Sequence, residues 1–335
     1  MSITLESDGL TISVTPQVGG TITGVRHRQS GLSVLGRVPW APVNAPLPSL
    51  AARDEPEWLT RYTGGWPLLF PNAGDSCLDG DVFHGFHGEA SIAPWDAVAT
   101  PRAITLERRF SIIPAFMRRR ISVEGDVLTV QESLAYSGAD PMEVMWGHHP
   151  SFGSDLLAGP FEITCGAADV TVEAQYDPPA NPLLPGAAGH WPQVAGKQGV
   201  ADLRHPSSPW SSVAYLENFQ SHWAAIRRLD DAIAIMLSWD GARFPVAWAW
   251  YELDGTAEAP WSGRTRLIGI EPNTTPCALC LAESRRRNAA LLRLEPGCEI
   301  SAEIRLHVFK PAGPILQDTG GLGIEPTPSN EARPS

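Results

Sequence analysis

The chain has 335 residues, of which 43% are hydrophobic and 19% charged, and its formal net charge is −12. This length allows one large β domain or two smaller ones, each with a sizeable core. The acidic charge argues against nucleic acid or an anionic membrane as a partner. The first residues lack the features of a secretion signal and no apolar run could span a bilayer, so we expect a cytoplasmic protein.

Short strands separated by turn residues dominate the sequence. Residues 3–7 and 10–15 alternate in period two around Ser-Asp-Gly, which predicts a hairpin. Similar patterns predict strands at residues 21–26, 104–110, 119–123, 127–134, 169–173, 223–228, 232–239, 246–251 and 301–309. Helical periodicity is nearly absent, and we expect one short helical turn at residues 48–53. Strands without interleaved helices predict an all-β sandwich or barrel of mostly antiparallel strands.

Two irregular segments bear on the domain organisation. Residues 177–186 are proline-rich but also apolar, so we interpret them as a rim loop within one domain. Residues 317–335 are rich in glycine, proline and serine without apolar periodicity, which is typical of a flexible tail. We therefore expect a single domain over residues 1–316, followed by the tail.

The five cysteines do not make a disulfide framework in a chain this long. Cys277 and Cys280 have CxxC spacing, but neither a second CxxC nor a helix start accompanies them. We interpret them as buried thiols near a strand, with a redox or zinc role as the alternative.

Three segments carry side chains suited to acid/base chemistry. His149 follows a strand-like run, His87 opens a His-Gly-Glu sequence, and Glu271 follows an apolar run. Partial burial would raise the pKa of that carboxylate toward neutrality, where imidazoles also titrate. The alternative for Glu271 is a salt bridge to Arg264 or Arg266.

Two neighbouring positions have alternative interpretations. His148 and His149 are adjacent, so in an extended chain they point to opposite faces and only one enters a common cleft. Asn72 stands at a turn after an apolar run, where its amide either holds a ligand hydroxyl or caps the turn.

Taken in order, five motifs resemble those of the aldose 1-epimerase (galactose mutarotase-like) family. They are Gly-Trp-Pro-Leu-Leu-Phe-Pro-Asn-Ala-Gly at 65–74, His-Gly-Glu-Ala-Ser-Ile-Ala-Pro-Trp at 87–95, Gly-His-His-Pro-Ser-Phe at 147–152, Phe-Pro-Val-Ala-Trp-Ala-Trp at 244–250 and Pro-Trp-Ser-Gly-Arg-Thr-Arg-Leu-Ile-Gly-Ile-Glu-Pro at 260–272. They extend over well over half of the chain. The resemblance implies a β-supersandwich with an open cleft across its concave sheet.

The resemblance also implies three catalytic residues. His87 corresponds to the histidine that contacts the sugar near its ring oxygen, and His149 to the general acid toward that oxygen. Glu271 corresponds to the general base on the anomeric hydroxyl. Ser151 stands where the family carries a tyrosine. Opening and reclosing a hemiacetal needs one proton acceptor and one donor, so we expect neither a metal nor a cofactor.

Five further residues are expected to bind the sugar, because tryptophan rings stack on its apolar face and polar groups orient it. They are Asn72, Trp66, Trp248, Trp261 and Arg264. Two departures from the family pattern concern this set. Ala73 replaces the arginine of well-studied mutarotases, and the aspartate that grips sugar hydroxyls has only Asp240 and Asp254 as candidates.

The expected function is therefore mutarotation of a hexose or hexose derivative by a monomer or homodimer. Arg264 and Arg266 leave room for an epimerase or isomerase of a phosphorylated or acidic sugar. A carbohydrate-binding sandwich without catalysis is a further alternative, with Glu271 structural. A metal-dependent cupin-like enzyme is another, and its ligands would come from His84, His87, Glu89, His148 and His149.

Overall fold

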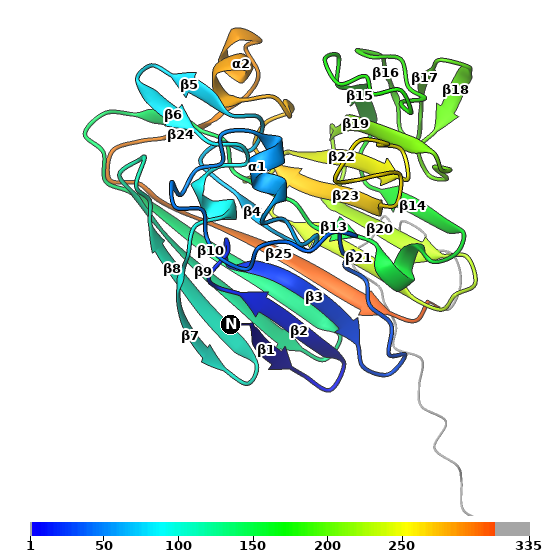
Figure 1. Cartoon of the computed structure of the whole chain (residues 1–335), viewed down its shortest axis with the longest axis horizontal. Coiled ribbons are helices and arrows are strands. Elements are labelled where there is room, and N and C mark those ends of the chain that lie inside the picture. The colour runs from blue at the N-terminus through cyan, green and yellow to red at the C-terminus, as the bar shows by residue number, and fades with distance from the viewer. Residues whose placement is uncertain (1, 312–335) are drawn as a thin grey trace, which may run out of the picture.

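The computed structural model describes residues 2–311, and strands dominate it (Figure 1). The all-β prediction is confirmed, and every pair of named strands in this part of the chain is antiparallel. The predicted domain end at residue 316 and the predicted tail lie outside the described residues.

Two large sheets form the body of the molecule. The first sheet has the order β14 (Phe161–Cys165), β20 (Trp223–Arg228), β21 (Ala234–Trp239), β25 (Glu299–Phe309), β10 (Val127–Tyr136), β9 (Ala115–Glu124), β8 (Ala103–Arg109) and β7 (Asp96–Thr100). The second sheet has the order β16 (Ala188–His190), β15 (Asp169–Val172), β19 (Trp210–Glu217), β22 (Val246–Leu253), β23 (Arg266–Asn273), β12 (Gly147–His148) and β4 (Leu68–Leu69), and β13 (Ser151–Phe152) also pairs with β23.

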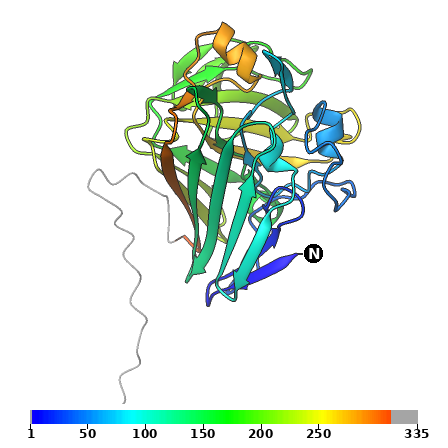
Figure 2. The same cartoon turned by 90° about the vertical axis from the view of Figure 1, so that its left-hand side faces the viewer.

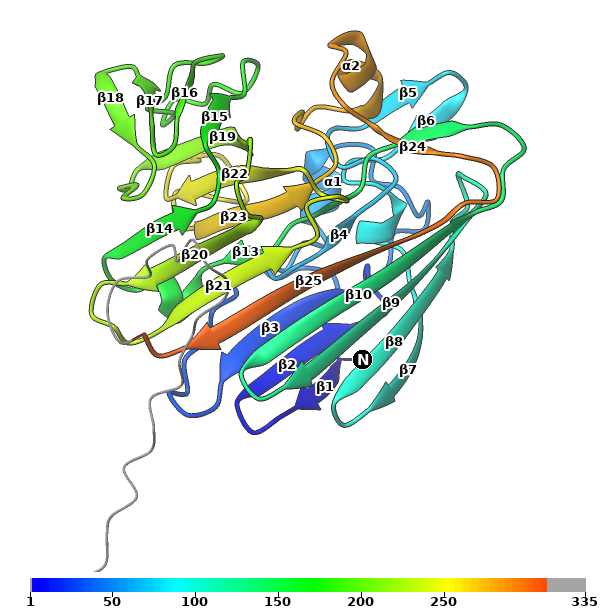
Figure 3. The same ribbon diagram turned by 180° about the vertical axis from the view of Figure 1, so that it is seen from behind.

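Smaller strand groups complete the architecture. A three-stranded sheet consists of β1 (Ile3–Glu6), β2 (Leu10–Thr15) and β3 (Thr21–His27). Two hairpins pair β5 (Cys77–Asp79) with β6 (Val82–His84) and β17 (Gln193–Gly196) with β18 (Gly199–Asp202), and a two-stranded sheet joins β11 (Met142–Val144) to the distant β24 (Leu292–Leu294). Short 3₁₀ helices lie at Glu89–Ser91 and Ser154–Leu157. Seen from behind, the long strands of the first sheet run side by side (Figure 3).

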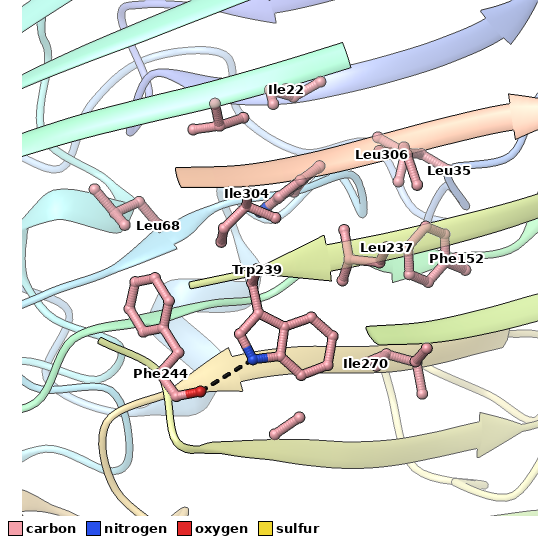
Figure 4. Close-up of a cluster of buried hydrophobic side chains, with 14 of the residues drawn as sticks. Ile22, Leu35, Leu68, Phe152, Leu237, Trp239, Phe244, Ile270, Ile304 and Leu306 are labelled. Atoms are coloured by element: carbon pink, nitrogen blue, oxygen red, sulfur yellow. Dashed lines mark hydrogen bonds between the residues drawn. The ribbon is translucent and has the colours of Figure 1, made fainter. Parts of the chain in front are cut away.

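Period-two alternation explains how the two sheets share a core. In β10 every second side chain is buried, and β9 shows the matching pattern across the register. Figure 4 shows Ile304 and Leu306 of β25 and Leu237 of β21 in the same cluster as Ile270 of β23. The indole of Trp239 donates a hydrogen bond of 3.0 Å to the carbonyl oxygen of Phe244 in this core.

One buried charged cluster interrupts the apolar core. Arg119 of β9 and Glu132 of β10 are register partners, and their Nε and Oε1 atoms lie 2.8 Å apart. The other oxygen of Glu132 accepts a hydrogen bond from the indole of Trp146 and lies 3.2 Å from Nε2 of His148. Nδ1 of His148 accepts from the indole of Trp66. Because an indole only donates, a neutral His148 carries its proton on Nε2, toward Glu132.

The helix predictions need two corrections. No helix forms at residues 48–53; α1 spans Glu55–Leu59, where Asp54 caps it by accepting a hydrogen bond of 2.9 Å from the Glu57 amide. A second helix, α2 (Leu281–Arg286), begins directly after Cys280, so the CxxC spacing does precede a helix start. No helix among the described residues is long and apolar enough to cross a membrane.

The face of the second sheet at β22 and β23 lies between two groups of elements. α2 with β5 and β6 rises on one side, and β15 to β18 rise on the other, as both Figure 1 and Figure 3 show. α1 lies near this face, on the same side of the molecule as the N-terminal strands (Figure 2).

Candidate active site

β23 presents Glu271 on the face of the second sheet that points away from the core. Ile268 and Ile270 belong to the core, so by alternation Gly269 and Glu271 face the opposite side. Trp248 of β22 is the register partner of Glu271. Glu271 is only 2% exposed, and among the described residues no side chain other than the His149 imidazole engages its carboxyl group.

His149 follows β12 and reaches the same place. Its Nδ1 lies 3.2 Å from Oε1 of Glu271, and the residue is 6% exposed. The adjacent His148 points into the core, which agrees with the expected opposite orientation. Gly269 is required for the contact, because a Cβ there would lie 2.1 Å from Oε1 of Glu271.

Two hydroxyl groups lie behind His149. Oγ of Ser151, on β13, is 3.2 Å from Nδ1 of His149. The hydroxyl of Tyr62, which follows α1, is 2.5 Å from the same Oγ. Both residues are buried, at 0% and 4% exposure. The Tyr62 hydroxyl thus contacts Ser151, the residue that stands where the aldose 1-epimerase motif carries a tyrosine.

His87 completes the imidazole group, with its ring centroid 5.5 Å from that of His149. Its Nδ1 is 2.5 Å from the Ala73 carbonyl oxygen, which can only accept, so Nδ1 carries the proton and Nε2 is left as an acceptor. His87 has a left-handed φ of 57°, and Gly88 follows with φ 73°. A Cβ at Gly88 would lie 2.3 Å from the Phe70 carbonyl oxygen, so this place requires glycine.

Aromatic rings enclose the two histidines. The ring of Trp58, on α1, stacks on His149 at 6.2 Å and 12° and meets His87 edge-on at 4.7 Å. Trp250 of β22 meets His149 edge-on at 5.2 Å, and Trp261 packs against Trp250. A cavity of about 350 Å³ adjoins this enclosure; Trp58 and Tyr62 line it, whereas Glu271 and His149 do not.

Burial shifts the pKa values of all three catalytic candidates toward their neutral forms. It raises the pKa of Glu271 well above its usual value. It lowers the pKa of His149 well below 6.5, with help from the nearby His87, and lowers the pKa of His87 to about 4. Although the 3.2 Å contact would suit an ion pair, desolvation outweighs it, so Glu271 and His149 form a neutral pair.

The carboxyl oxygens of Glu271 and the ring nitrogens of His149 are nonetheless not sealed from solvent. Among the described residues, several buried polar atoms lack both solvent and a partner, including Nδ1 of His84. Neither Glu271 oxygen and neither His149 nitrogen belongs to that group. Apart from the contact with His149 the carboxyl group has no polar partner in the described part of the chain, so its oxygens keep a small area in contact with solvent. They are therefore available to the polar atoms of a small ligand.

The residues predicted to bind the sugar divide into two groups. Trp248 and Trp261 lie near the pair: the first is the strand neighbour of Glu271, and the second packs 6.5 Å from Tyr62. Trp66 is fully buried in the core and bonds His148, so it cannot serve as a stacking platform. The predicted role of Trp66 is wrong because its side chain points to the core face.

The predicted sugar-binding roles of Asn72 and Arg264 also need correction. The Asn72 amide donates to three backbone carbonyls, and its oxygen accepts from the Leu281 amide, so it holds the loop together as in the capping alternative. Arg264 is exposed and lines a separate groove of about 420 Å³ with Arg37 and Arg266. Arg266 pairs with Asp254, and within the described residues neither arginine forms the predicted alternative salt bridge with Glu271.

The candidate sugar-binding aspartates and the cupin-like metal ligands do not form a site in the part of the chain that the structure describes. Asp254 is engaged with Arg266 and Ser208, and Asp240 bonds the backbone of its own turn, so neither aspartate contacts the pair. Within residues 2–311, no group of three or more suitable side chains is arranged to hold a metal ion. Of the cupin-like ligand set, Glu89 instead binds Arg108 and the backbone amides of Ser111 and Ile112.

Sequence reasoning missed Trp58 and Tyr62, which close over His149. A usable signal was present, because Asp-Glu-Pro-Glu at 54–57 combines a capping residue with an early proline and acidic residues, which is typical of a helix start. Trp58 and Tyr62 are four residues apart, so a predicted helix that ran on past Leu59 would have placed both side chains on the same helix face.

Solved structures with the same architecture are numerous, although no family model and no curated protein matches the sequence. A galactose mutarotase related enzyme from Lactobacillus acidophilus is 16% identical, with a TM-score of 0.61, and the match covers 92% of this chain and 97% of that one. The chain has the galactose mutarotase-like fold. A galactose mutarotase-like protein from Lactobacillus casei matches over 92% of this chain and 100% of its own, at 16% identity and TM-score 0.59.

A protein from Escherichia coli K12 that is provisionally assigned as an aldose 1-epimerase has a TM-score of 0.67 at 16% identity, with 93% of this chain and 99% of that chain covered. The structural matches establish the galactose mutarotase-like fold, but sequence identities this low do not establish the reaction.

Proposed function

We propose that this protein is an aldose 1-epimerase that interconverts the α and β anomers of a hexose. The observation that carries the proposal is the contact of 3.2 Å between Oε1 of Glu271 and Nδ1 of His149, two buried groups whose polar atoms are not sealed from solvent. A carboxyl group and an imidazole in one enclosed site can supply both proton transfers of ring opening.

The mechanism begins with the neutral pair. Transfer of the Glu271 proton to Nδ1 of His149 creates carboxylate and imidazolium without changing the total charge, and the short contact allows it. Glu271 then takes the proton of the anomeric hydroxyl while Nε2 of His149 protonates the ring oxygen. The bond between the anomeric carbon and the ring oxygen breaks, which leaves the open-chain aldehyde and a free hydroxyl. Rotation of the aldehyde and reversal of both transfers close the other anomer.

His87 and the aromatic rings support this mechanism. Because Nδ1 of His87 donates to the backbone, its Nε2 can accept a hydrogen bond from a sugar hydroxyl. Trp248 is the strand neighbour of Glu271 and Trp250 packs edge-on against His149, so both indoles help to form an apolar surrounding for the pair. Arg264 lines a separate groove rather than this site, whereas Arg37 and Arg61 line the cavity that adjoins it.

The test is anomer exchange measured by two-dimensional NMR over neutral, phosphorylated and sulfonated hexoses. We expect exchange of at least one neutral hexose to accelerate, and Glu271→Gln to lower kcat by about 10²–10⁴-fold, the usual contribution of a general base. Glu303→Gln, on the exposed surface of β25, is the matched control. Sugar binding without faster exchange would support a binding module, and loss of activity in a chelator would support a metal enzyme.

A further inference from the structure

Nδ1 of His149 has two oxygen neighbours at the same distance. Oε1 of Glu271 and Oγ of Ser151 both lie 3.2 Å away, so the carboxyl group is not the only group that can bond this nitrogen. Oγ of Ser151 is in turn 2.5 Å from the Tyr62 hydroxyl, which links Tyr62 to His149 through one intervening atom.

Packing holds this hydroxyl pair in place. The ring of Tyr62 stacks on Trp58 at 4.5 Å and 26° and packs near Trp261. Ser151 belongs to β13, whose register with Gly269 of β23 places it beside Glu271. Neither hydroxyl is therefore a mobile surface group, and both are fixed by separate elements of the fold.

Hydroxyl groups have a property that the reaction requires at Nδ1. In the proposed function Nδ1 alternates between a bare and a protonated state. Ser151 can donate to the bare nitrogen and accept from the protonated one, and either atom of the Tyr62–Ser151 contact can be the donor. Glu271 can donate to the bare nitrogen only while its carboxyl group is protonated, whereas the serine hydroxyl can serve both states whatever the charge of Glu271.

We propose that Tyr62 and Ser151 are positioning residues that keep Nδ1 of His149 hydrogen-bonded in both states and so aim Nε2 at the ring oxygen. This inference rests on the proposed function. Burial raises the pKa of Tyr62, so its phenol keeps its proton and acts as a hydrogen-bonding group rather than as a base.

Three variants test the pair: Tyr62→Phe, which keeps the ring, Ser151→Ala, and the double variant. Loss of one hydrogen bond to a catalytic group predicts about a tenfold fall in kcat for each single variant, with KM within about twofold. Because Tyr62 acts through Ser151, the double variant should be no slower than Ser151→Ala. Ser151→Thr restores a hydroxyl and should recover activity. Tyr136→Phe, a buried tyrosine bonded to the Asp140 carbonyl, is the matched control.

A second measurement does not depend on turnover. Nitrogen-15 NMR of histidine-labelled protein reports the state of each imidazole nitrogen, and His149→Gln identifies the His149 signals among the nine histidines. The Nδ1 signal should shift in Tyr62→Phe and Ser151→Ala but not in Tyr136→Phe.

Unchanged Nδ1 signals, wild-type kcat in Tyr62→Phe, or additive losses in the double variant would each overturn the inference. If Glu271→Gln is inactive while both hydroxyl variants match the wild type, only this inference fails. If Glu271→Gln is fully active, the proposed function fails, and the NMR shifts still decide whether the hydroxyl pair bonds His149.

Discussion

Gly269→Ala is a direct test of how the fold positions the catalytic carboxyl group. A Cβ at Gly269 would lie 2.1 Å from Oε1 of Glu271 and 3.0 and 3.1 Å from two carbons of the same side chain, with no other atom as close. The backbone φ at Gly269 is not left-handed, so alanine fits the strand. The substitution should therefore displace Glu271 alone, and the fold should gain about 0.4–1 kcal/mol from reduced freedom of the unfolded chain.

The size of the effect follows from that geometry. Oε1 must retreat by more than an ångström to reach an ordinary contact of 3.4 Å, which moves it out of its place beside His149. Misplacement of a catalytic group by about 1 Å costs roughly 100-fold in rate, or about 2.7 kcal/mol in barrier.

Anomer exchange by NMR gives kcat, and thermal unfolding verifies the fold. The matched control is Gly24→Ala in β3, whose added Cβ would find its nearest atom 3.8 Å away. Wild-type kcat in folded Gly269→Ala would refute the reasoning that this Glu271 geometry serves catalysis.

Three further predictions address pH, stability and specificity. The pKa of His87 is about 4 in the folded protein against 6.5 for an unperturbed imidazole. Its contribution to stability, up to about 3 kcal/mol, is therefore complete above pH 6.5 and is lost as the pH falls toward 4. Urea unfolding should show a flatter pH dependence in His87→Asn. Glu132→Gln leaves Arg119 buried without a counter-ion and should lower the free energy of unfolding by about 3–5 kcal/mol, whereas a near-neutral effect would mean that Arg119 reaches water. Arg264→Ala should leave kcat and KM for neutral hexoses within about twofold of the wild type, and a large rise in KM would restore Arg264 to the sugar site.

The long strands could be predicted from the sequence because their pattern is local. Alternation of apolar and polar residues places β2 at Leu10–Thr15, and a run of apolar residues begins β22 at Val246, as expected. The two-residue strands β12 and β13 carry too little pattern to detect, although His149 directly follows the first and Ser151 begins the second. The helix at Glu55–Leu59 was placed too early because its capping sequence, rather than its periodicity, marks it.

By itself, the sequence determined the all-β architecture and indicated Glu271, His149 and His87 as candidates. Strand alternation and the order of the motifs are properties of the linear sequence, so they can be read without a structure. Which side chains surround these residues was decided only by the tertiary structure. Trp66 and Arg264 lie near site motifs in sequence, yet strand alternation and loop direction carry them to the core and to a separate groove. Tyr62 meets Ser151 across 89 positions of sequence, a contact that chain packing creates and that no local pattern encodes.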